Sequence, residues 1–345
     1  MTIKEIAKRA NVSLGTVDRV IHDRGKVSKE TKEKILRILK EVDYKPNFYA
    51  RGLVLNKSYV ITALVPDFDA GEYWEMPSRG IKQAAKDLNQ FGIKVVFFYF
   101  DQNDSESFIR KVQEVLELKP DGVILTPVIN FEAVKLCARL RTMAIPFSII
   151  DSNIQNSGSI SFIGQDAIQS GRLAAKLLST STGGKGKILI LSIKNNENHN
   201  KTLQKRSEGF KDFLSQSDSL QDIKIVELNV DQRESNWKEC LEDILVGQNP
   251  DGIYVPSSKV HFVAEVLMKR KLKIKLVGND LIDNNLDFIA AGIIDYIIDQ
   301  RPETQGYLAV ENFYKYLVTK QRVENDYYLP LDIITKENYM YYRSQ

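Results

Sequence analysis

The chain has 345 residues, which is long for a single hydrophobic core and predicts two or three domains. With 43% hydrophobic and 27% charged residues, its composition is that of a folded globular protein and excludes a disordered one. No apolar run approaches the roughly 20 residues of a membrane helix. The N-terminus leads directly into an amphipathic helical pattern, so we expect no signal peptide and no membrane partner.

The net charge of +3 hides an uneven distribution along the chain. Residues 1–58 contain 14 Lys and Arg against 7 Asp and Glu, whereas the remainder contains 34 against 38. A basic segment on an acidic body is typical of a DNA-binding domain joined to a second function. The alternative is that the basic helices are simply solvated.

Three short helices are predicted in the first 44 residues. Thr2 and Glu5 form a capping box for the first helix, and Ser13 can cap the second. A third helix is predicted over residues 28–42. The residues at helical spacing that we expect on the buried sides are Ile3, Ile6, Ala7, Ala10, Val17, Val20, Ile21, Ile35, Leu36, Ile38, Leu39 and Val42. This is the helix-turn-helix arrangement, but a plain three-helix bundle has the same spacing.

Motifs in the first 55 residues keep the order and spacing of one family. They are TIKEIAKRANVS at 2–13, TV at 16–17, VSKET at 27–31, YKPN at 44–47 and ARGL at 50–53. In these motifs the chain resembles the lactose/purine repressor family, whose members are homodimers or larger assemblies. The resemblance implies operator DNA as a partner, read as a near-palindrome by paired recognition helices.

The resemblance implies base contacts from Leu14, Gly15 and Arg19. Arg19 is the natural guanine reader through a bidentate hydrogen bond, and Leu14 can touch a thymine methyl group. Thr16 is expected to bind phosphate. The DNA-facing set that we expect is completed by Thr2, Asp18, His22, Asn47 and Leu53.

Asp18 stands where the family usually has serine. Its carboxylate could accept from a cytosine amino group, fix a neighbouring arginine, or form a salt bridge with Arg9 or Arg24. The sequence does not choose among these roles.

Residues 47–58 could be a plain linker. In the resembling family this segment becomes a short helix on operator DNA, and a leucine from each subunit wedges into the minor groove and kinks the duplex. Leu53 holds that position, while Val54 stands where the family often has a basic residue.

From Tyr59 onward the pattern alternates between strands and helices. Strands are expected at 60–65, 94–100, 122–126 and 147–150, with a helix at 78–91, and again at 187–193, 223–230, 252–255 and 273–278. The segments KPDGVI at 119–124 and NPDGIY at 249–254 place the same turn before a strand in both series. We therefore expect two α/β lobes with parallel sheets and a ligand cleft at the strands' carboxyl ends.

A second set of motifs resembles ribose-type periplasmic sugar-binding proteins. The pieces are ID at 150–151, FIGQD at 162–166, RSEGF at 206–210, VGND at 277–280 and QRPETQG at 300–306. The resemblance implies sugar contacts from Asp151, Arg206, Asp280 and Gln300. Carboxylates, an amide and a guanidinium suit hydroxyls that both donate and accept.

Two positions depart from the sugar binders' pattern. Ser152 replaces an arginine, and Ser257 replaces an asparagine that contacts the ligand. A modified, larger or acyclic ligand is therefore an alternative to a simple sugar. Asp151 and Asp280 could also be strand-end caps or turn residues.

Aromatic rings are expected to cover the C–H faces of a sugar. Tyr73 and Trp74, in the loop after the first strand, are the best candidates, followed by Phe68. The alternative for each ring is packing in the core.

The sequence contains no P-loop, HExxH or CxxC motif, and His22, His199 and His261 have no metal-ligand spacing. We expect no catalytic residues, no metal and no cofactor. Cys137 and Cys240 are predicted to be ordinary buried thiols on helices of different lobes.

The predicted class is therefore α/β. A helix-turn-helix domain (1–46) and a hinge (47–58) precede a two-lobed, doubly wound sensor like the type I periplasmic binding proteins (59–345). The resemblances imply a cytoplasmic, nucleoid-associated homodimeric regulator controlled by a small effector. The alternatives are a sugar-binding transport component or an enzyme that uses the cleft.

Overall fold

The computed structural model describes residues 3–21, 27–41, 57–194, 201–216 and 220–342. The chain divides into two compact units, Met1–Val54 and Leu55–Gln345. Within the described ranges, no helix combines the length and the apolar character needed to span a membrane.

The first unit contains three helices, α1 (Ile3–Ala10), α2 (Leu14–Ile21) and α3 (Lys29–Glu41). The side-chain oxygen of Ser13 accepts a hydrogen bond from the Thr16 amide at 3.1 Å, as predicted for the start of α2. The Ser28 hydroxyl caps α3 in the same way, at 3.3 Å from the Thr31 amide. The buried side chains shared by the three helices are Ile6, Ala7, Ala10, Val17, Val20, Ile35 and Ile38.

The prediction that Leu36 faces this core is wrong. Its side chain is 47% exposed. Ile35, Ile38 and Leu39 lie three and four residues apart on one face of α3, and a residue one position after Ile35 is rotated away from that face. The predicted core positions Ile3, Ile21 and Val42 lie outside the described side chains.

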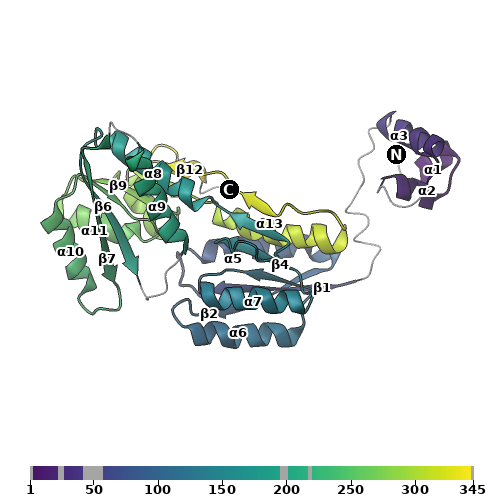
Figure 1. Cartoon of the computed structure of the whole chain (residues 1–345), viewed down its shortest axis with the longest axis horizontal. Helices are drawn as coiled ribbons and strands as arrows, with labels where there is room; N and C mark the ends of the chain where they lie inside the picture. Colours follow the sequence, from purple (N-terminus) through teal and green to yellow (C-terminus); the bar gives the residue numbers. More distant parts are fainter. Residues whose placement is uncertain (1–2, 22–26, 42–56, 195–200, 217–219, 343–345) are drawn as a thin grey trace. The chain divides into compact units, whose positions relative to one another are not determined.

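The second unit contains two lobes of similar plan (Figure 1). The first lobe has a sheet of order β11-β5-β4-β3-β1-β2 in which every pairing is parallel. Its elements before the first crossover are β1 (Tyr59–Pro66), α5 (Glu75–Leu88), η1 (Asn89–Phe91), β2 (Ile93–Phe100), α6 (Ser105–Leu118), β3 (Gly122–Leu125), α7 (Asn130–Thr142), β4 (Phe147–Asp151) and β5 (Ser161–Gly164).

The second lobe has a sheet of order β12-β10-β9-β8-β6-β7, parallel except for the pairing of β10 with β12. Its elements are α8 (Ala167–Ser181), β6 (Gly186–Lys194), α9 (Lys201–Ser215), β7 (Ile223–Asp231), α10 (Trp237–Gln248), β8 (Gly252–Tyr254), α11 (Val260–Arg270), β9 (Lys275–Asn279), α12 (Asp283–Ala290) and β10 (Tyr296–Asp299). The chain then returns to the first lobe for α13 (Pro302–Phe313), η3 (Tyr314–Val318) and β11 (Asp326–Tyr328). It ends in the second lobe with β12 (Asp332–Ile334) and α14 (Tyr339–Tyr342).

Helices cover both faces of each sheet, as the α/β prediction requires. In the first lobe α6 and α7 lie along one face, and α5 and α13 lie along the other (Figure 1). In the second lobe α10, α11 and α12 pack on one face, and α8 and α9 pack on the other. The inner strands, such as β1, β3, β4 and β8, are buried on both sides, which explains their nearly continuous apolar sequences.

The repeated Pro-Asp-Gly turn is confirmed in both lobes. The Asp121 carboxylate accepts a hydrogen bond from the Val60 amide at 2.8 Å, and the Asp251 carboxylate accepts one from the Lys187 amide at 2.7 Å. Each aspartate thereby ties the start of one strand to the start of its neighbour, so the turn sets the strand register at the same place in each lobe.

Three crossovers join the lobes, between β5 and α8, between β10 and α13, and between β11 and β12. The side chain of Gln165, in the first crossover, donates to the Asp299 carbonyl at 2.7 Å and to the Pro330 carbonyl at 3.4 Å. One buried amide therefore links all three segments about which the lobes could move.

Sequence patterns located the other eight strands, including the short β3 and β8 that follow the Pro-Asp-Gly turns, but missed β5, β10, β11 and β12. These strands have only three or four residues each, too short for a clear periodicity. Cys137 is buried as predicted, but Cys240 is exposed. The buried positions of α10 are Leu241 and Leu245, and Cys240 is rotated off that stripe.

Candidate functional site

A cleft of about 1120 Å³ lies at the carboxyl ends of the strands of both lobes. It is larger than the pockets of ~300–1,000 Å³ that commonly hold small ligands. Seven of the eight side chains predicted to contact a ligand line it: Tyr73, Trp74, Asp151, Arg206, Ser257, Asp280 and Gln300. The residues chosen from the sequence therefore come together in one cleft, and their contact with a ligand stays a prediction.

Phe68, which was expected to be a further ligand-facing ring, is not among the residues that line the cleft. Its ring packs edge-on against Tyr99 of β2, with 5.7 Å between ring centres, and against the first lobe's core. This is the core-packing alternative that was open for each aromatic residue.

Asp151 ends β4, and its carboxylate accepts a hydrogen bond from the Tyr73 hydroxyl at 2.7 Å. Burial raises the pKa of Asp151, although the hydrogen bond from Tyr73 and the charge of Arg206 oppose this shift. Burial and the neighbouring carboxylates hold the pKa of Tyr73 well above its usual value. Tyr73 therefore stays protonated and keeps donating to Asp151.

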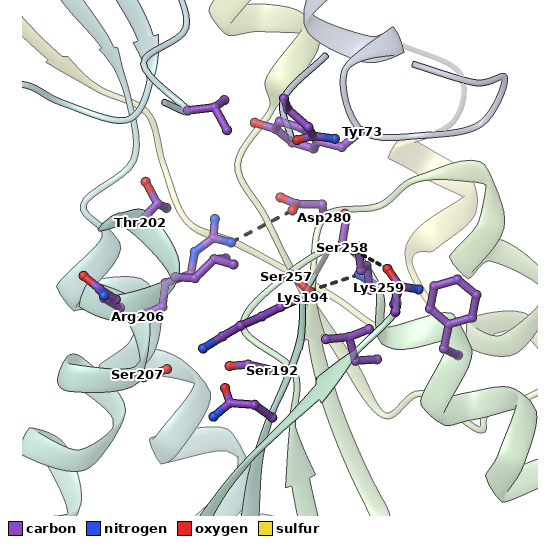
Figure 2. A pocket seen from close by; sticks show the side chains of 18 of the residues that line it. Tyr73, Ser192, Lys194, Thr202, Arg206, Ser207, Ser257, Ser258, Lys259 and Asp280 are labelled. Carbon is purple, nitrogen blue, oxygen red and sulfur yellow. Dashed lines mark hydrogen bonds and ion pairs between the residues drawn. The ribbon is translucent and has the colours of Figure 1, made fainter. Parts of the chain in front are cut away.

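Asp280 follows β9 on the opposite wall. Its carboxylate accepts a hydrogen bond from the Gln300 amide at 2.8 Å and lies 4.0 Å from the Arg206 guanidinium. Figure 2 shows the Arg206 guanidinium directed toward the Asp280 carboxylate, with a dashed line that marks this ion pair. Burial raises the pKa of Asp280 to about 7, against the opposing effect of Arg206.

Arg206, in the second turn of α9, is only 1% exposed. One of its terminal nitrogens donates to the Pro256 carbonyl at 2.8 Å. Its Nε and Nη2 have no hydrogen-bond partner among the described residues. Burial lowers the pKa of Arg206, but the surrounding acidic groups, Asp280 foremost, together outweigh burial and raise the pKa, so the guanidinium stays charged. Buried donors without partners are costly, so a ligand that accepts hydrogen bonds from these two nitrogens would stabilise the site.

Gln305 joins the two aspartate sites, and sequence reasoning missed it. Its side-chain oxygen accepts from the Asp151 amide at 3.0 Å, and its nitrogen donates to the Gln300 carbonyl at 3.0 Å. Gln305 belongs to the motif at 300–306, for which the resemblance implies a sugar contact only from the leading glutamine, Gln300.

The wall formed by the second lobe contains further side chains that the sequence did not single out. They are Ser192, Lys194, Thr202, Ser207, Gln232, Trp237, Ser258, Lys259, His261 and Phe262. Trp237 and Phe262 pack edge-to-face with 4.9 Å between ring centres. Burial lowers the pKa of Lys259 to about 8. Ser192 and Lys194 could have been found from the alternation of β6, whose other face is apolar.

Ser152, which replaces an arginine of the sugar binders, does not line the cleft. Its hydroxyl accepts a hydrogen bond from Thr202 at 2.8 Å. Among the described residues no three His, Cys, Asp or Glu side chains are arranged to hold a metal ion.

In the first unit, α2 presents Gly15, Arg19 and the 50% exposed Leu14 to solvent, while Val17 and Val20 are buried. The Thr16 hydroxyl lies 2.9 Å from that of Ser13. Arg9, one of the partners considered for Asp18, forms a salt bridge with Glu41 at 2.7 Å. The side chain of Asp18 and the residues Thr2, His22, Arg24, Asn47, Leu53 and His199 lie outside the described part.

Comparisons with known proteins agree with both resemblances. Residues 2–47 match the family model for bacterial regulatory proteins of the lacI family, and residues 61–321 match that for a periplasmic binding protein domain. The ribose operon repressor of Lactococcus lactis subsp. lactis is 28% identical over 97% of both chains. The sucrose operon repressor of Streptococcus mutans is 27% identical over 97% of this chain and 92% of that one.

Solved structures support the same assignment. The crystal structure of a candidate LacI transcriptional regulator from Bacteroides fragilis superimposes with a TM-score of 0.77 and 28% identity, over 83% of this chain and 99% of that one. A match of this extent covers both lobes. The chain belongs to the lacI family of bacterial regulatory proteins, with the family's DNA-binding domain at its N-terminus and a periplasmic binding protein domain over most of its length.

Proposed function

We propose that the protein is a transcriptional repressor that binds operator DNA through α2 and is controlled by a polyhydroxylated effector, a sugar or sugar derivative, in the cleft. The observation that carries this proposal is the buried set formed by Asp151, Arg206, Asp280 and Gln300 in a chain that begins with a lacI-type domain. The set combines acceptors and donors in one cleft, which suits hydroxyls that do both.

The walls of the cleft supply complementary parts of such a site. The first lobe contributes the Tyr73–Asp151 pair and the ring of Trp74, whose indole nitrogen donates to Gln102 at 3.3 Å. The second lobe contributes the Gln300–Asp280 pair and Arg206. An effector bound to both walls would favour the closed arrangement of the lobes, and closure is how binding at the cleft can reach the DNA-binding domain. Coupling of this kind is typically ~1–3 kcal/mol and is reciprocal.

The regulator acts as a homodimer in the cytoplasm, at the nucleoid, with domains at 1–46, 47–58 and 59–345. Paired copies of α2 read the two halves of an operator, and the base-reading residues are Leu14, Gly15 and Arg19. Leu53 from each subunit kinks the DNA. The names of the relatives, ribose and sucrose operon repressors, support the choice of a sugar as the effector class.

A sugar-binding transport component is the second candidate, because transport proteins share the two-lobed fold. The crystal structure of a glucose-galactose binding protein from Geobacillus stearothermophilus superimposes with a TM-score of 0.70 at 23% identity. The lacI-type domain favours the regulator, because solute transport does not require a DNA-binding domain. An enzyme is disfavoured because the relatives that match over the whole chain are repressors.

The test begins with selection of a preferred operator from random duplexes by the full-length protein. Operator affinity is then measured by gel shift with and without each member of a panel of sugars. At least one sugar should change operator affinity several-fold, and Asp280→Asn should lose this response while still binding the operator. If the protein binds every duplex alike, through salt-sensitive attraction that no sugar changes, the proposal is wrong.

A further inference from the structure

One corner of the cleft, between the end of β6 and the start of α9, is lined by positively charged and hydroxyl side chains. Along β6, Leu191 and Ile193 point into the core on one face. Strand alternation therefore places Ser192 and Lys194 on the opposite face, toward α9. Figure 2 shows Lys194 reaching into the pocket below Arg206, with Ser192 and Ser207 beside it.

This corner is rich in unused hydrogen-bond donors. The Nε and Nη2 of the buried Arg206 have no partner among the described residues. Lys194 is half-buried, and no carboxylate of the described part lies within ion-pair distance of its ammonium. Ser192 and Ser207 add two hydroxyls. A partly buried ammonium without a counter-ion is unfavourable, so a ligand that supplies negative charge would stabilise this corner.

The acidic side chains near this corner are already engaged or lie at the surface. Glu227 is paired with Lys211 at 3.0 Å. Asp280 accepts from Gln300 and lies on the other side of the guanidinium, 4.0 Å from one terminal nitrogen. Glu208 lines the cleft but is exposed. Among the residues that the structure describes, the positive charge of Lys194 is therefore the least compensated one in this part of the wall.

We propose that the effector carries an anionic group, a phosphate or a carboxylate, which binds in the corner formed by Lys194, Arg206 and Ser207. Its hydroxyls face Asp151 and Asp280 across the cleft. This inference rests on the proposed function and narrows its effector class to sugar phosphates and sugar acids. A neutral hydroxyl fits less well because it brings a donor of its own, whereas a phosphate or carboxylate oxygen only accepts and forms stronger, charge-assisted bonds.

The experiment is calorimetric titration of the full-length protein with two matched sets. One set is D-ribose, D-ribose 5-phosphate and D-ribonate, and the other is D-glucose, D-glucose 6-phosphate and D-gluconate. At least one anionic member should bind about ten-fold or more tightly than its neutral parent, which corresponds to ~1.4 kcal/mol. The phosphate and acid arms distinguish the two sources of the charge.

Variants locate the interaction. Lys194→Met should remove most of the preference for the anion and leave the affinity for the neutral parent within about two-fold, a difference of ~0.4 kcal/mol. Lys194→Arg keeps the charge and should keep the preference. The matched control is Lys224→Met, because Lys224 is an exposed lysine of β7 that does not line the cleft.

Two results would overturn the inference. If neutral sugars bind as tightly as their phosphates and acids, the corner has no anionic ligand, although the proposed function survives. If the preference exists but is unchanged in Lys194→Met, the anion binds elsewhere and the assignment of this corner is wrong. Failure of the proposed function looks different, since no compound of either set would then bind or alter operator affinity.

Discussion

Asp151 and Asp280 occupy equivalent positions in the two lobes, each at the carboxyl end of a strand and each with a left-handed backbone, at φ values of 70° and 68°. Aspartate tolerates this conformation better than most residues, and such strained positions gather at functional sites. Both carboxylates are held by a hydrogen-bond donor from their own surroundings, Tyr73 for Asp151 and Gln300 for Asp280. The internal symmetry of the fold thus places one preorganised acceptor on each wall of the cleft.

The stability of the unliganded protein should fall as pH rises toward and through 7. Burial raises the pKa of Asp280 to about 7, whereas an aspartate in an unfolded chain titrates near ~3.9. Between these values the folded state keeps a proton that the unfolded state has lost, so the free energy of unfolding decreases with rising pH. The stabilising contribution is complete below pH ~4 and lost above pH ~7.

Asp280→Asn tests this pH dependence. Thermal denaturation of the unliganded protein at pH 6, 7 and 8 should show a decrease for the wild type and a smaller one for the variant. Some slope should remain, because burial also raises the pKa of Asp151 and Asp299. Identical slopes in the two proteins would mean that Asp280 does not titrate in this range.

Gly171→Ala should displace Arg206, a residue that lines the cleft, although Gly171 itself lies outside the cleft. A Cβ atom at Gly171 of α8 would lie 1.8 Å from the backbone oxygen of Arg206 and 2.9 Å from the Phe210 amide nitrogen. The methyl group must push α9 away from α8, at a cost of about 1–3 kcal/mol for an overpacked contact, and Arg206 moves with its helix. We expect a lower melting temperature and weaker effector binding.

The matched control is Gly247→Ala in α10, where an added Cβ meets nothing within 4 Å. Alanine at an open helical position should be neutral or stabilising by up to ~1 kcal/mol, with unchanged effector affinity. If Gly171→Ala binds effector normally while losing stability, the position of Arg206 does not depend on the close contact between α8 and α9.

Arg19→Ala should relax operator specificity at one base position. Arg19 is exposed on α2, and its side chain forms no salt bridge with the described residues. Loss of a bidentate contact to guanine should cost about 1–3 kcal/mol at that base and little elsewhere. Selection of preferred duplexes by the wild type and the variant measures this effect. An unchanged preference at every position would remove Arg19 from the readout.

The sequence predicted those features that depend on short-range physics. The cap at Ser13 and the paired turns at Asp121 and Asp251 depend on neighbouring residues, and the structure has them. The resemblance to the sugar binders then located Asp151, Arg206, Asp280 and Gln300 in one cleft.

Other features depend on packing between distant segments, which no local pattern contains. Phe68 packs on Tyr99 of the next strand, and nothing in its polar loop indicates this contact. The link through Gln305 spans more than 150 residues of chain. Lys194 can be recognised as a candidate anion-binding residue only from the structure, in which the neighbouring carboxylates pair with other groups.

Gln165→Leu should loosen the connection between the lobes. In the wild type the buried amide donates to carbonyls of the two other crossovers, at 2.7 Å to Asp299 and 3.4 Å to Pro330. Leucine has a similar size but no donor, so it leaves a buried carbonyl unpaired at a cost of about 1–3 kcal/mol. Chemical denaturation should show this loss. Gln83→Leu on the surface of α5, where Gln83 donates only to the exposed Asp87, should stay within ~0.5 kcal/mol of the wild type.

The effect of Gln165→Leu on regulation separates a hinge role from a purely structural one. None of the residues that line the cleft is altered, so contacts with the effector in the closed state are preserved. If Gln165 sets the balance between open and closed lobes, the effector concentration needed to change operator affinity should shift, while operator affinity without effector and the size of the maximal response change as well. A variant that is less stable but regulated exactly like the wild type would show that Gln165 holds the crossovers together without influencing closure.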